Sequence, residues 1–284
     1  MQQSSSSPSP LRGEGWGEGA VDSSREVSVV RVAEGVVEQV VDRVAEETPV
    51  ALVYNGVPQV VMMATPEHLE DLAVGFTLSE SIVRAQAEIQ SVRVSRVTDG
   101  AQVDISIAGE RLSELLRRQR NLTGRTGCGV CGVETIDQAL RHPQPVATAV
   151  RLNSQQLHAA LRQLADMQTL NATVGSVHSA AWGQPDQGIQ VVREDVGRHN
   201  ALDKVIGALV RERIDPTSGY FVITSRASYE MVLKAATAGA SILVAVSAPT
   251  ALAIDLAMQS NLTLVGFARE SRYVIYAHPG RIEP

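Results

Sequence analysis

The only two cysteines of the 284-residue chain, Cys128 and Cys131, form a CxxC pair. The surrounding segment, residues 124–132, reads GRTGCGVCG and contains four glycines. Glycine adopts positive φ and lets another molecule approach the backbone closely, so we expect both thiols on an accessible loop rather than in a core. Arg125 in the same segment favours the thiolate, which is the reactive form of cysteine. The sequence therefore predicts thiol chemistry at this loop.

Three kinds of chemistry fit a CxxC pair. A zinc site would need two further ligands, but the chain has no second CxxC, and His178 and His199 lie at no recognisable ligand spacing. A thioredoxin-like dithiol begins a helix after a strand, without so many flanking glycines. A sulfur carrier needs a thiolate that can reach both a persulfide donor and an acceptor, which suits a glycine-rich loop. We favour the carrier, and the other two readings stay open.

A second set of polar residues follows successive predicted strands in the last hundred residues. The strands are expected at 189–193, 220–224, 241–246 and 262–266, and the first three are each followed by a predicted helix. Repeated strand–turn–helix units form a largely parallel sheet, in which the carboxyl ends of the strands share one edge. We therefore expect these polar residues to lie together: Asp195, Arg198, His199, Asn200, Ser225, Arg226, Ser228, Thr250, Arg269 and Arg272.

Such an edge suits a phosphate-bearing nucleotide. Arginines and helix N-termini bind pyrophosphate, and a carboxylate accepts hydrogen bonds from guanine. The chain has no Walker A sequence, so this is not a P-loop site. The plainer alternative is that these charges cap helices and pair with one another at the surface.

The rest of the chain predicts the elements that position these two sites. Residues 1–25 are rich in Ser, Pro and Gly, and we expect a disordered tail. Residues 26–145 form a small α+β domain that ends in the CxxC loop, and residues 146–284 form the larger domain, with Pro143 and Pro145 at the boundary. Hairpins are predicted at Asn55-Gly56 and at residues 99–100.

Helices are predicted after two capping residues in particular. Thr65 is expected to cap a helix with Pro66 in its first position, because proline has no N–H to leave unpaired there. Asn153 or Ser154 caps a helix that runs to about Met167.

Composition excludes several classes of protein. The formal net charge of −6 argues against broad nucleic-acid binding. Two cysteines make no disulfide framework, which favours a reducing cytoplasm. No apolar run reaches the ~18 residues of a membrane span, and we expect neither a signal peptide nor a membrane partner.

Three segments resemble one known family. They are residues 125–132 (RTGCGVCG), residues 194–204 (EDVGRHNALDK) and residues 225–232 (SRASYEMV). Together they resemble FdhD, the formate dehydrogenase accessory sulfurtransferase family, and the resemblance covers about residues 26–284.

The resemblance implies a function. Proteins of this family are sulfur carriers, classed as sulfurtransferases, that take sulfur from a cysteine desulfurase as a cysteine persulfide. They deliver it to the molybdenum bis(guanine dinucleotide) cofactor, or its tungsten variant, before the cofactor enters formate dehydrogenase. The resemblance also implies a cytidine-deaminase-like three-layer larger domain and a cytoplasmic homodimer.

The resemblance further implies roles for individual residues. Cys128 would carry the persulfide, and Cys131 would relay sulfur or resolve the persulfide. The cofactor-binding segment would be Phe267, Ala268, Arg269, Glu270, Ser271 and Arg272. To these we add Asp195, Arg198, His199, Ser225 and Arg226 from the sheet edge.

The likeness in fold to cytidine deaminases does not imply deaminase activity. Deamination needs a zinc-bound water and an H-x-E glutamate, and residues 178–181 read HSAA instead. We therefore expect no deamination and no catalytic zinc. A cofactor-binding chaperone whose thiols transfer nothing remains the second functional class.

Overall fold

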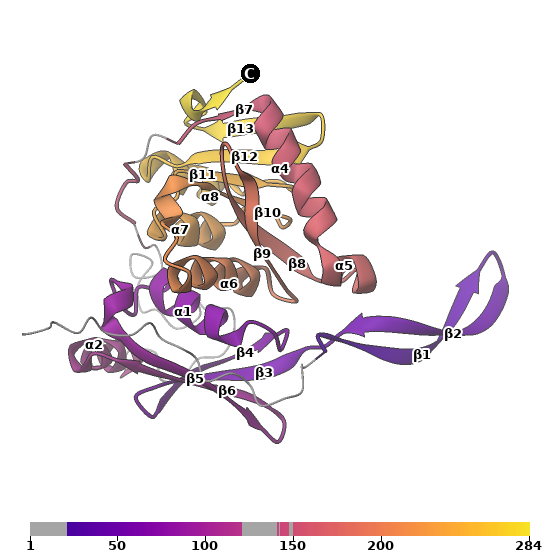
Figure 1. The fold of residues 1–284 in the computed structure, drawn as a ribbon, viewed down its shortest axis with the longest axis horizontal. Coiled ribbons are helices and arrows are strands. Elements are labelled where there is room, and N and C mark those ends of the chain that lie inside the picture. Colours follow the sequence, from indigo (N-terminus) through magenta and orange to yellow (C-terminus); the bar gives the residue numbers. More distant parts are fainter. Residues whose placement is uncertain (1–21, 121–140, 142, 148–149) are drawn as a thin grey trace, which may run out of the picture.

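The computed structural model describes residues 22–120, 141, 143–147 and 150–284. Two domains lie one above the other in Figure 1, and a two-stranded arm extends away from them. Cys128 and Cys131 lie outside the described residues. The predicted organisation, a larger α/β domain with a smaller α+β domain, is confirmed in the described part.

The smaller domain is built on a four-stranded sheet in the order β4-β3-β6-β5. Its strands are β3 (Thr48–Tyr54), β4 (Val57–Ala64), β5 (Ile89–Val97) and β6 (Gly100–Ile107), and its helices are α1 (Leu69–Ser79) and α2 (Gly109–Arg120). Both predicted hairpins are confirmed, since β3 pairs with β4 and β5 pairs with β6. Asn55 and Gly56 both have positive φ, as this tight turn requires.

The predicted start of α1 is wrong. The helix begins at Leu69, and the residue before it, His68, is in the left-handed region with φ of 56°. The Thr65 side chain caps no helix, because its hydroxyl donates to Asp195 and accepts from Lys204. A contact with the other domain therefore replaces the local cap.

The larger domain is built on a six-stranded sheet in the order β13-β12-β11-β10-β8-β9. Its strands are β8 (His178–Gln184), β9 (Gly188–Asp195), β10 (Tyr220–Ile223), β11 (Ile242–Ala245), β12 (Thr263–Arg269) and β13 (Arg272–Ala277). Only the β10–β11 and β11–β12 pairings are parallel, so the sheet is more mixed than expected. The unpredicted strand β8 is the reason, because it runs antiparallel between β10 and β9.

Helices cover both faces of this sheet. They are α4 (Ser154–Met167), α5 (Thr169–Val174), α6 (Arg198–Arg211), α7 (Tyr229–Thr237) and α8 (Ala251–Gln259). Trp182, Phe221 and Leu243 belong to one apolar cluster with α6, α7 and α8, whereas Val222 and Val244 belong to a second cluster with α4. The alternation along each strand gives a three-layer domain. The α4 prediction is confirmed, with Asn153 as its cap. None of the described helices is long and apolar enough to cross a membrane.

The two domains meet where α1 crosses α6. A Cβ added at Gly75 of α1 would lie 1.8 Å from the carbonyl oxygen of Asp203, and one added at Gly207 of α6 would lie 1.8 Å from that of Asp71. Only glycine permits so close an approach of two helix backbones. The crossing therefore depends on both glycines.

Two buried ion pairs accompany this crossing. The fully buried Lys204 lies 2.6 Å from Asp195, and the backbone N–H of Thr65 donates to the same carboxylate. Lys234 lies 2.9 Å from Asp203, which also accepts from Ser79 of α1. Each pair joins the larger domain to residues of the smaller one. We call the glycine crossing and these two pairs the seam.

The arm is formed by β1 (Ser24–Ala33) and β2 (Val36–Ala45), which pair antiparallel along their whole length. Ser24 and Arg25 therefore belong to a strand and not to the predicted tail, because they pair with Ala45 and Val44. The rest of that tail, residues 1–21, lies outside the described residues.

Candidate functional site

The shared sheet edge predicted from the sequence exists. Strands β9, β10, β11 and β12 all run in the same direction, because β9 and β10 are each antiparallel to β8 and β10–β12 are parallel. Their carboxyl ends therefore lie on one edge of the sheet. His178 lies on the same edge, because β8 runs the other way and begins there.

Backbone hydrogen bonds hold the loops after β10 and β11 and the end of β12 side by side. The Ala227 N–H donates to the carbonyl of Ala248, and the Thr250 N–H donates back to the carbonyl of Ala227. The Phe267 N–H donates to the carbonyl of Ser247 at 3.1 Å. The loops after β10 and β11 and the end of β12 thus form one continuous surface.

The N-termini of α6 and α7 also meet at this edge. His199 Nε2 lies 2.8 Å from Glu230 Oε2, and this contact lowers the pKa of Glu230. Burial, together with the charges of Arg198 and His199, lowers the pKa of His178, so that its imidazole is neutral near pH 7. The N-caps Gly197 and Ser228 make no side-chain capping bond.

Two buried polar atoms at this edge have neither a hydrogen-bond partner nor an ion pair within the described chain. They are the hydroxyl oxygen of Ser228 and the Nε atom of Arg198. Buried polar atoms are nearly always hydrogen-bonded, so such atoms call for a ligand or an ordered water. An anionic oxygen fits both of them, because each can donate a hydrogen bond and helix N-termini favour negative charge.

Most of the residues predicted for cofactor binding are exposed, and some are buried. Arg226 is exposed, and Arg269 is exposed with its guanidinium donating to the carbonyls of Val246 and Ala268. Phe267 is 46% exposed and has φ of 48° at a bulge of β12, and Glu270 and Ser271 form the exposed turn to Arg272. Ser225 is buried, and its hydroxyl donates to the carbonyl of Arg226.

Two of the predicted contacts require correction. Asp195 is fully buried, and its oxygens already accept from Lys204, Thr65, Gly197 and Asn200. It therefore holds the seam and cannot accept from a ligand. The Ala268 side chain points into the apolar cluster under α4, which leaves only its backbone for contact with a ligand.

The sequence reading missed an anchor at the end of the cysteine segment. Arg141 donates to the Glu80 carboxylate at 2.6 Å, and its own carbonyl accepts from the Tyr229 hydroxyl at 2.7 Å. Tyr229 begins α7 directly beside the edge loops. We call Glu80, Arg141 and Tyr229 the clasp. The only sequence signal was the position of Tyr229 inside the segment SRASYEMV.

Glu80 is ionised in the clasp. Burial raises its pKa, but Lys234 and Arg141 outweigh burial and lower the pKa to about 2. The carboxylate thus joins the clasp to the buried Lys234–Asp203 pair, because Lys234 lies 2.9 Å from each of the two acids.

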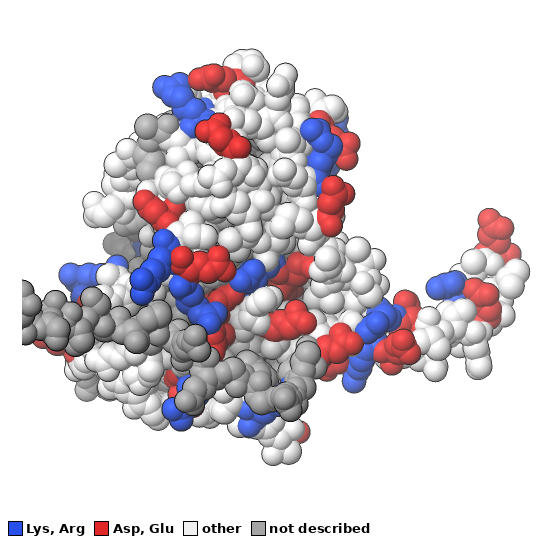
Figure 2. Space-filling view, viewed as in Figure 1, with Lys and Arg blue, Asp and Glu red and all other residues white. Residues whose placement is uncertain are grey.

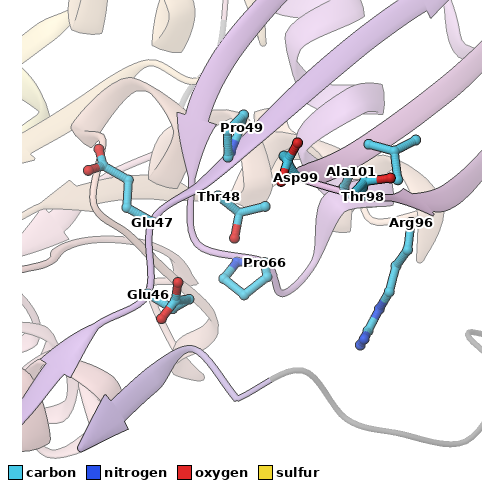
Figure 3. A pocket seen from close by; sticks show the side chains of 11 residues that line it. Glu46, Glu47, Thr48, Pro49, Pro66, Arg96, Thr98, Asp99 and Ala101 are labelled. Carbon is cyan, nitrogen blue, oxygen red and sulfur yellow. The ribbon is translucent and has the colours of Figure 1, made fainter. Parts of the chain in front are cut away.

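A hollow of about 330 Å³ lies elsewhere, between the foot of the arm and the smaller domain. Figure 3 shows its lining, which includes Glu46, Glu47, Arg96 and Asp99. All of its lining residues lie between positions 46 and 101, so it shares no residue with the sheet edge.

Comparisons with known proteins agree on one family. The family model of FdhD/NarQ matches residues 45–283. The chain is 53% identical over 242 residues to the sulfur carrier protein FdhD of Xanthomonas campestris pv. campestris (strain B100), covering 85% of this chain and 86% of that protein. It is 50% identical to the protein of the same name from Cupriavidus necator, with 85% and 84% covered.

A solved structure is also similar. It is the crystal structure of a proposed formate dehydrogenase accessory protein from Desulfotalea psychrophila, with a TM-score of 0.72 and 25% sequence identity. The match covers 91% of this chain and 99% of that one.

Proposed function

Since the chain belongs to the FdhD/NarQ family, we propose that it is a sulfur carrier serving formate dehydrogenase. In this proposal it accepts persulfide sulfur from a cysteine desulfurase on Cys128. It then passes the sulfur to the molybdenum bis(guanine dinucleotide) cofactor, or to its tungsten form, before that cofactor enters formate dehydrogenase.

The observation that carries the proposal is the clasp beside the sheet edge. Cys128 precedes Arg141 by 13 residues, a length of chain that spans at most about 45 Å. The clasp fixes Arg141 against the first residue of α7, whose N-terminus faces the edge loops. A thiol tethered at this point can reach a substrate held at the edge.

The edge supplies what a guanine dinucleotide needs. Arg226 and Arg269 add positive charge where the loops after β10 and β11 are hydrogen-bonded to each other and to β12, and two helix N-termini add oriented N–H groups. Ser228 and Arg198 add donors that lack a protein partner in the described chain. These groups suit pyrophosphate oxygens, with the metal end of the substrate directed toward the tethered thiols.

In the proposed sulfur transfer, each S–S bond that forms is matched by one that breaks or by a reduction. The Cys128 thiolate attacks the outer sulfur of the desulfurase persulfide, the donor S–S bond breaks, and the desulfurase cysteine leaves as a thiolate. The terminal sulfur of the Cys128 persulfide then binds the metal of the substrate. Attack of the Cys131 thiolate on Cys128 releases that sulfur with the electron pair of the broken S–S bond. A Cys128–Cys131 disulfide remains, which cytoplasmic thiol reductants reduce.

The test begins with intact-mass measurement after incubation with a cysteine desulfurase and cysteine. We expect the mass of one added sulfur on the wild type and on Cys131→Ser, mapped to Cys128, and none on Cys128→Ser. The loaded protein is then mixed with the cofactor and apo formate dehydrogenase, and formate oxidation is measured. A wild-type protein that never gains sulfur would contradict the proposal.

A cofactor-binding chaperone is the second candidate, and the cysteine variants separate the two. A chaperone with Cys128→Ala would bind the cofactor and still activate formate dehydrogenase. A carrier with the same change would bind the cofactor and fail to activate the enzyme. Full transfer by Cys131→Ser would show that Cys131 is no relay. The homodimer implied by the family resemblance stays a prediction here.

A further inference from the structure

Tyr229 has no role predicted from the sequence, yet it holds the first described residue after the two cysteines. Its hydroxyl donates to the carbonyl of Arg141 at 2.7 Å. The acceptor is a backbone atom, so this bond fixes the main chain at residue 141 and does not need the arginine side chain. Burial raises the pKa of Tyr229, so the hydroxyl keeps its proton and stays a donor at neutral pH.

The other end of the clasp holds the Arg141 side chain on the smaller domain. Its guanidinium donates to the Glu80 carboxylate at 2.6 Å and to the Glu80 carbonyl at 3.0 Å. Glu80 follows the last residue of α1, where helix carbonyls lack partners and a cation is favourable. Residue 141 is therefore held by both domains, through its side chain by α1 and through its backbone by α7.

Packing sets the position of the Tyr229 hydroxyl. The ring of Tyr229 packs against the apolar cluster that α6, α7 and α8 share. Two residues earlier, Ala227 exchanges backbone hydrogen bonds with the loop after β11. Helix α7 also contacts α1, and Figure 1 shows the two helices where the domains face each other. The hydroxyl is therefore a fixed donor within one helical turn of the sheet edge.

We propose that Tyr229 is a positioning residue for sulfur transfer. Its hydroxyl holds residue 141 beside the sheet edge, which raises the effective concentration of the tethered Cys128 at a substrate bound there. The inference rests on the proposed function and divides it into two steps. Loading from the desulfurase needs the thiol but not the Tyr229 bond, whereas transfer to the substrate needs both.

The expected effect is moderate, because the clasp has two ends. Tyr229→Phe removes the hydroxyl and keeps the ring in its packing. One neutral hydrogen bond of ordinary strength changes an equilibrium by roughly fivefold. In this variant Glu80 still bonds to the Arg141 side chain, so residue 141 keeps its contact with α1 and loses its contact with α7.

The joint between the domains does not depend on the Tyr229 hydroxyl. Asp71 of α1 lies 2.8 Å from Arg193 of β9, and Arg211 of α6 pairs with both Glu70 and Asp71. Figure 2 shows charged side chains of both signs gathered where the two domains meet. Tyr229→Phe should therefore shift the thermal midpoint by no more than about 3 °C.

Single-turnover transfer separates positioning from binding. Persulfide-loaded protein is mixed with increasing concentrations of the cofactor and excess apo formate dehydrogenase, and loss of the added sulfur is followed by intact mass. We expect Tyr229→Phe to load Cys128 as the wild type does and to keep the half-saturating cofactor concentration within about twofold, while its maximal transfer rate falls about fivefold. The matched control is Tyr54→Phe, which removes a hydroxyl that bonds to Thr77 at 2.8 Å inside the smaller domain, and it should transfer at the wild-type rate.

Three results of this measurement would overturn the inference. The first is a Tyr229→Phe protein with the wild-type maximal rate. The second is a Tyr229→Phe protein in which only the half-saturating concentration rises, since that would make the hydroxyl a substrate contact. The third is a Tyr54→Phe control slowed as much as Tyr229→Phe, since that would reduce the effect to a general loss of stability.

Disulfide trapping tests the same position without sulfur transfer. Cys131→Ser/Arg226→Cys leaves Cys128 and one thiol at the sheet edge. Under mild oxidant we expect these two thiols to form an intramolecular disulfide, and added Tyr229→Phe to slow its formation about fivefold, whereas added Tyr54→Phe leaves the rate unchanged. Equal rates with and without the Tyr229 hydroxyl would overturn the inference even if the wild type transfers sulfur. A slowed disulfide in a protein that never gains sulfur would support the positioning role and contradict the proposed function alone.

Discussion

The seam and the sheet edge use the same residue types for opposite purposes. At the seam, Asp195, Asp203, Lys204 and Lys234 are buried, and each bonds to groups of the other domain or of its own. At the edge, Arg226 and Arg272 are exposed, and no side-chain partner of either is found in the described chain. Charges that stabilise the fold have their partners inside the chain, whereas the exposed arginines of the edge have donors available for the ligand that we propose.

This difference explains why the EDVGRHNALDK segment mixes two roles. Asp195 and Lys204 lie at the seam, whereas Arg198 and His199 lie at the edge. One turn and the first half of α6 therefore link the seam to the sheet edge. A substitution in this segment affects stability or binding according to the direction in which its side chain points.

The largest effect on stability is expected at Lys204. Lys204→Met leaves the Asp195 carboxylate buried without its cation, which costs about 4 kcal/mol of unfolding free energy. The matched control is Arg151→Met, whose pair with Glu283 is exposed at 3.7 Å and contributes less than about 1 kcal/mol. Urea unfolding measures the unfolding free energy of both variants and of the wild type. Similar losses from the two variants would show that burial at the seam does not matter.

The next largest effect is expected at the helix crossing. Gly207→Ala puts a methyl group 1.8 Å from a backbone oxygen and should destabilise the protein by about 3 kcal/mol, although alanine is the better helix former. Gly109→Ala in α2 meets no atom within 4 Å and should be neutral or stabilising. Thermal unfolding monitored by circular dichroism compares them. A Gly207→Ala protein as stable as the wild type would show that the close helix crossing does not contribute to stability.

A smaller, pH-dependent effect is expected from the clasp. Glu80 has its pKa lowered from the ordinary 4.5 to about 2, so its stabilisation is present above pH 4.5 and is lost as pH falls toward 2. Glu80→Gln should therefore cost about 2 kcal/mol at pH 6, and this difference should shrink between pH 4.5 and pH 2.5. Denaturant unfolding at several pH values measures it. Glu114→Gln, which changes a more exposed partner of Arg111, is the control.

The smallest effect on stability is expected at the edge, where transfer should change instead. Arg226→Ala removes an exposed side chain and should alter the unfolding free energy by less than about 0.5 kcal/mol. Losing one charged contact with phosphate should reduce sulfur transfer at least about tenfold, while the desulfurase still loads Cys128. Mass spectrometry of loading and an activation assay separate the two steps. Unchanged transfer would place the substrate elsewhere.

The sequence by itself determined the hairpins, most helices and the shared strand ends, because these depend on local turn chemistry and on hydrophobic periodicity. Asn55-Gly56 requires positive φ wherever it lies, and Asn153 caps the helix that follows it. The run of small residues before Gln184 carried no such signal, and β8 was missed.

Only the tertiary structure decided what the polar residues do. Thr65 looked like a helix cap and Asp195 like a ligand contact, yet both bond to Lys204, and the Thr65 contact joins the two domains. Arg141 had no predicted role, yet it bonds to both Glu80 and Tyr229. The physical reason is that a polar side chain takes its role from its partners and its burial. Those are set by residues far away in the sequence, such as Thr65 and Lys204, which are 139 positions apart.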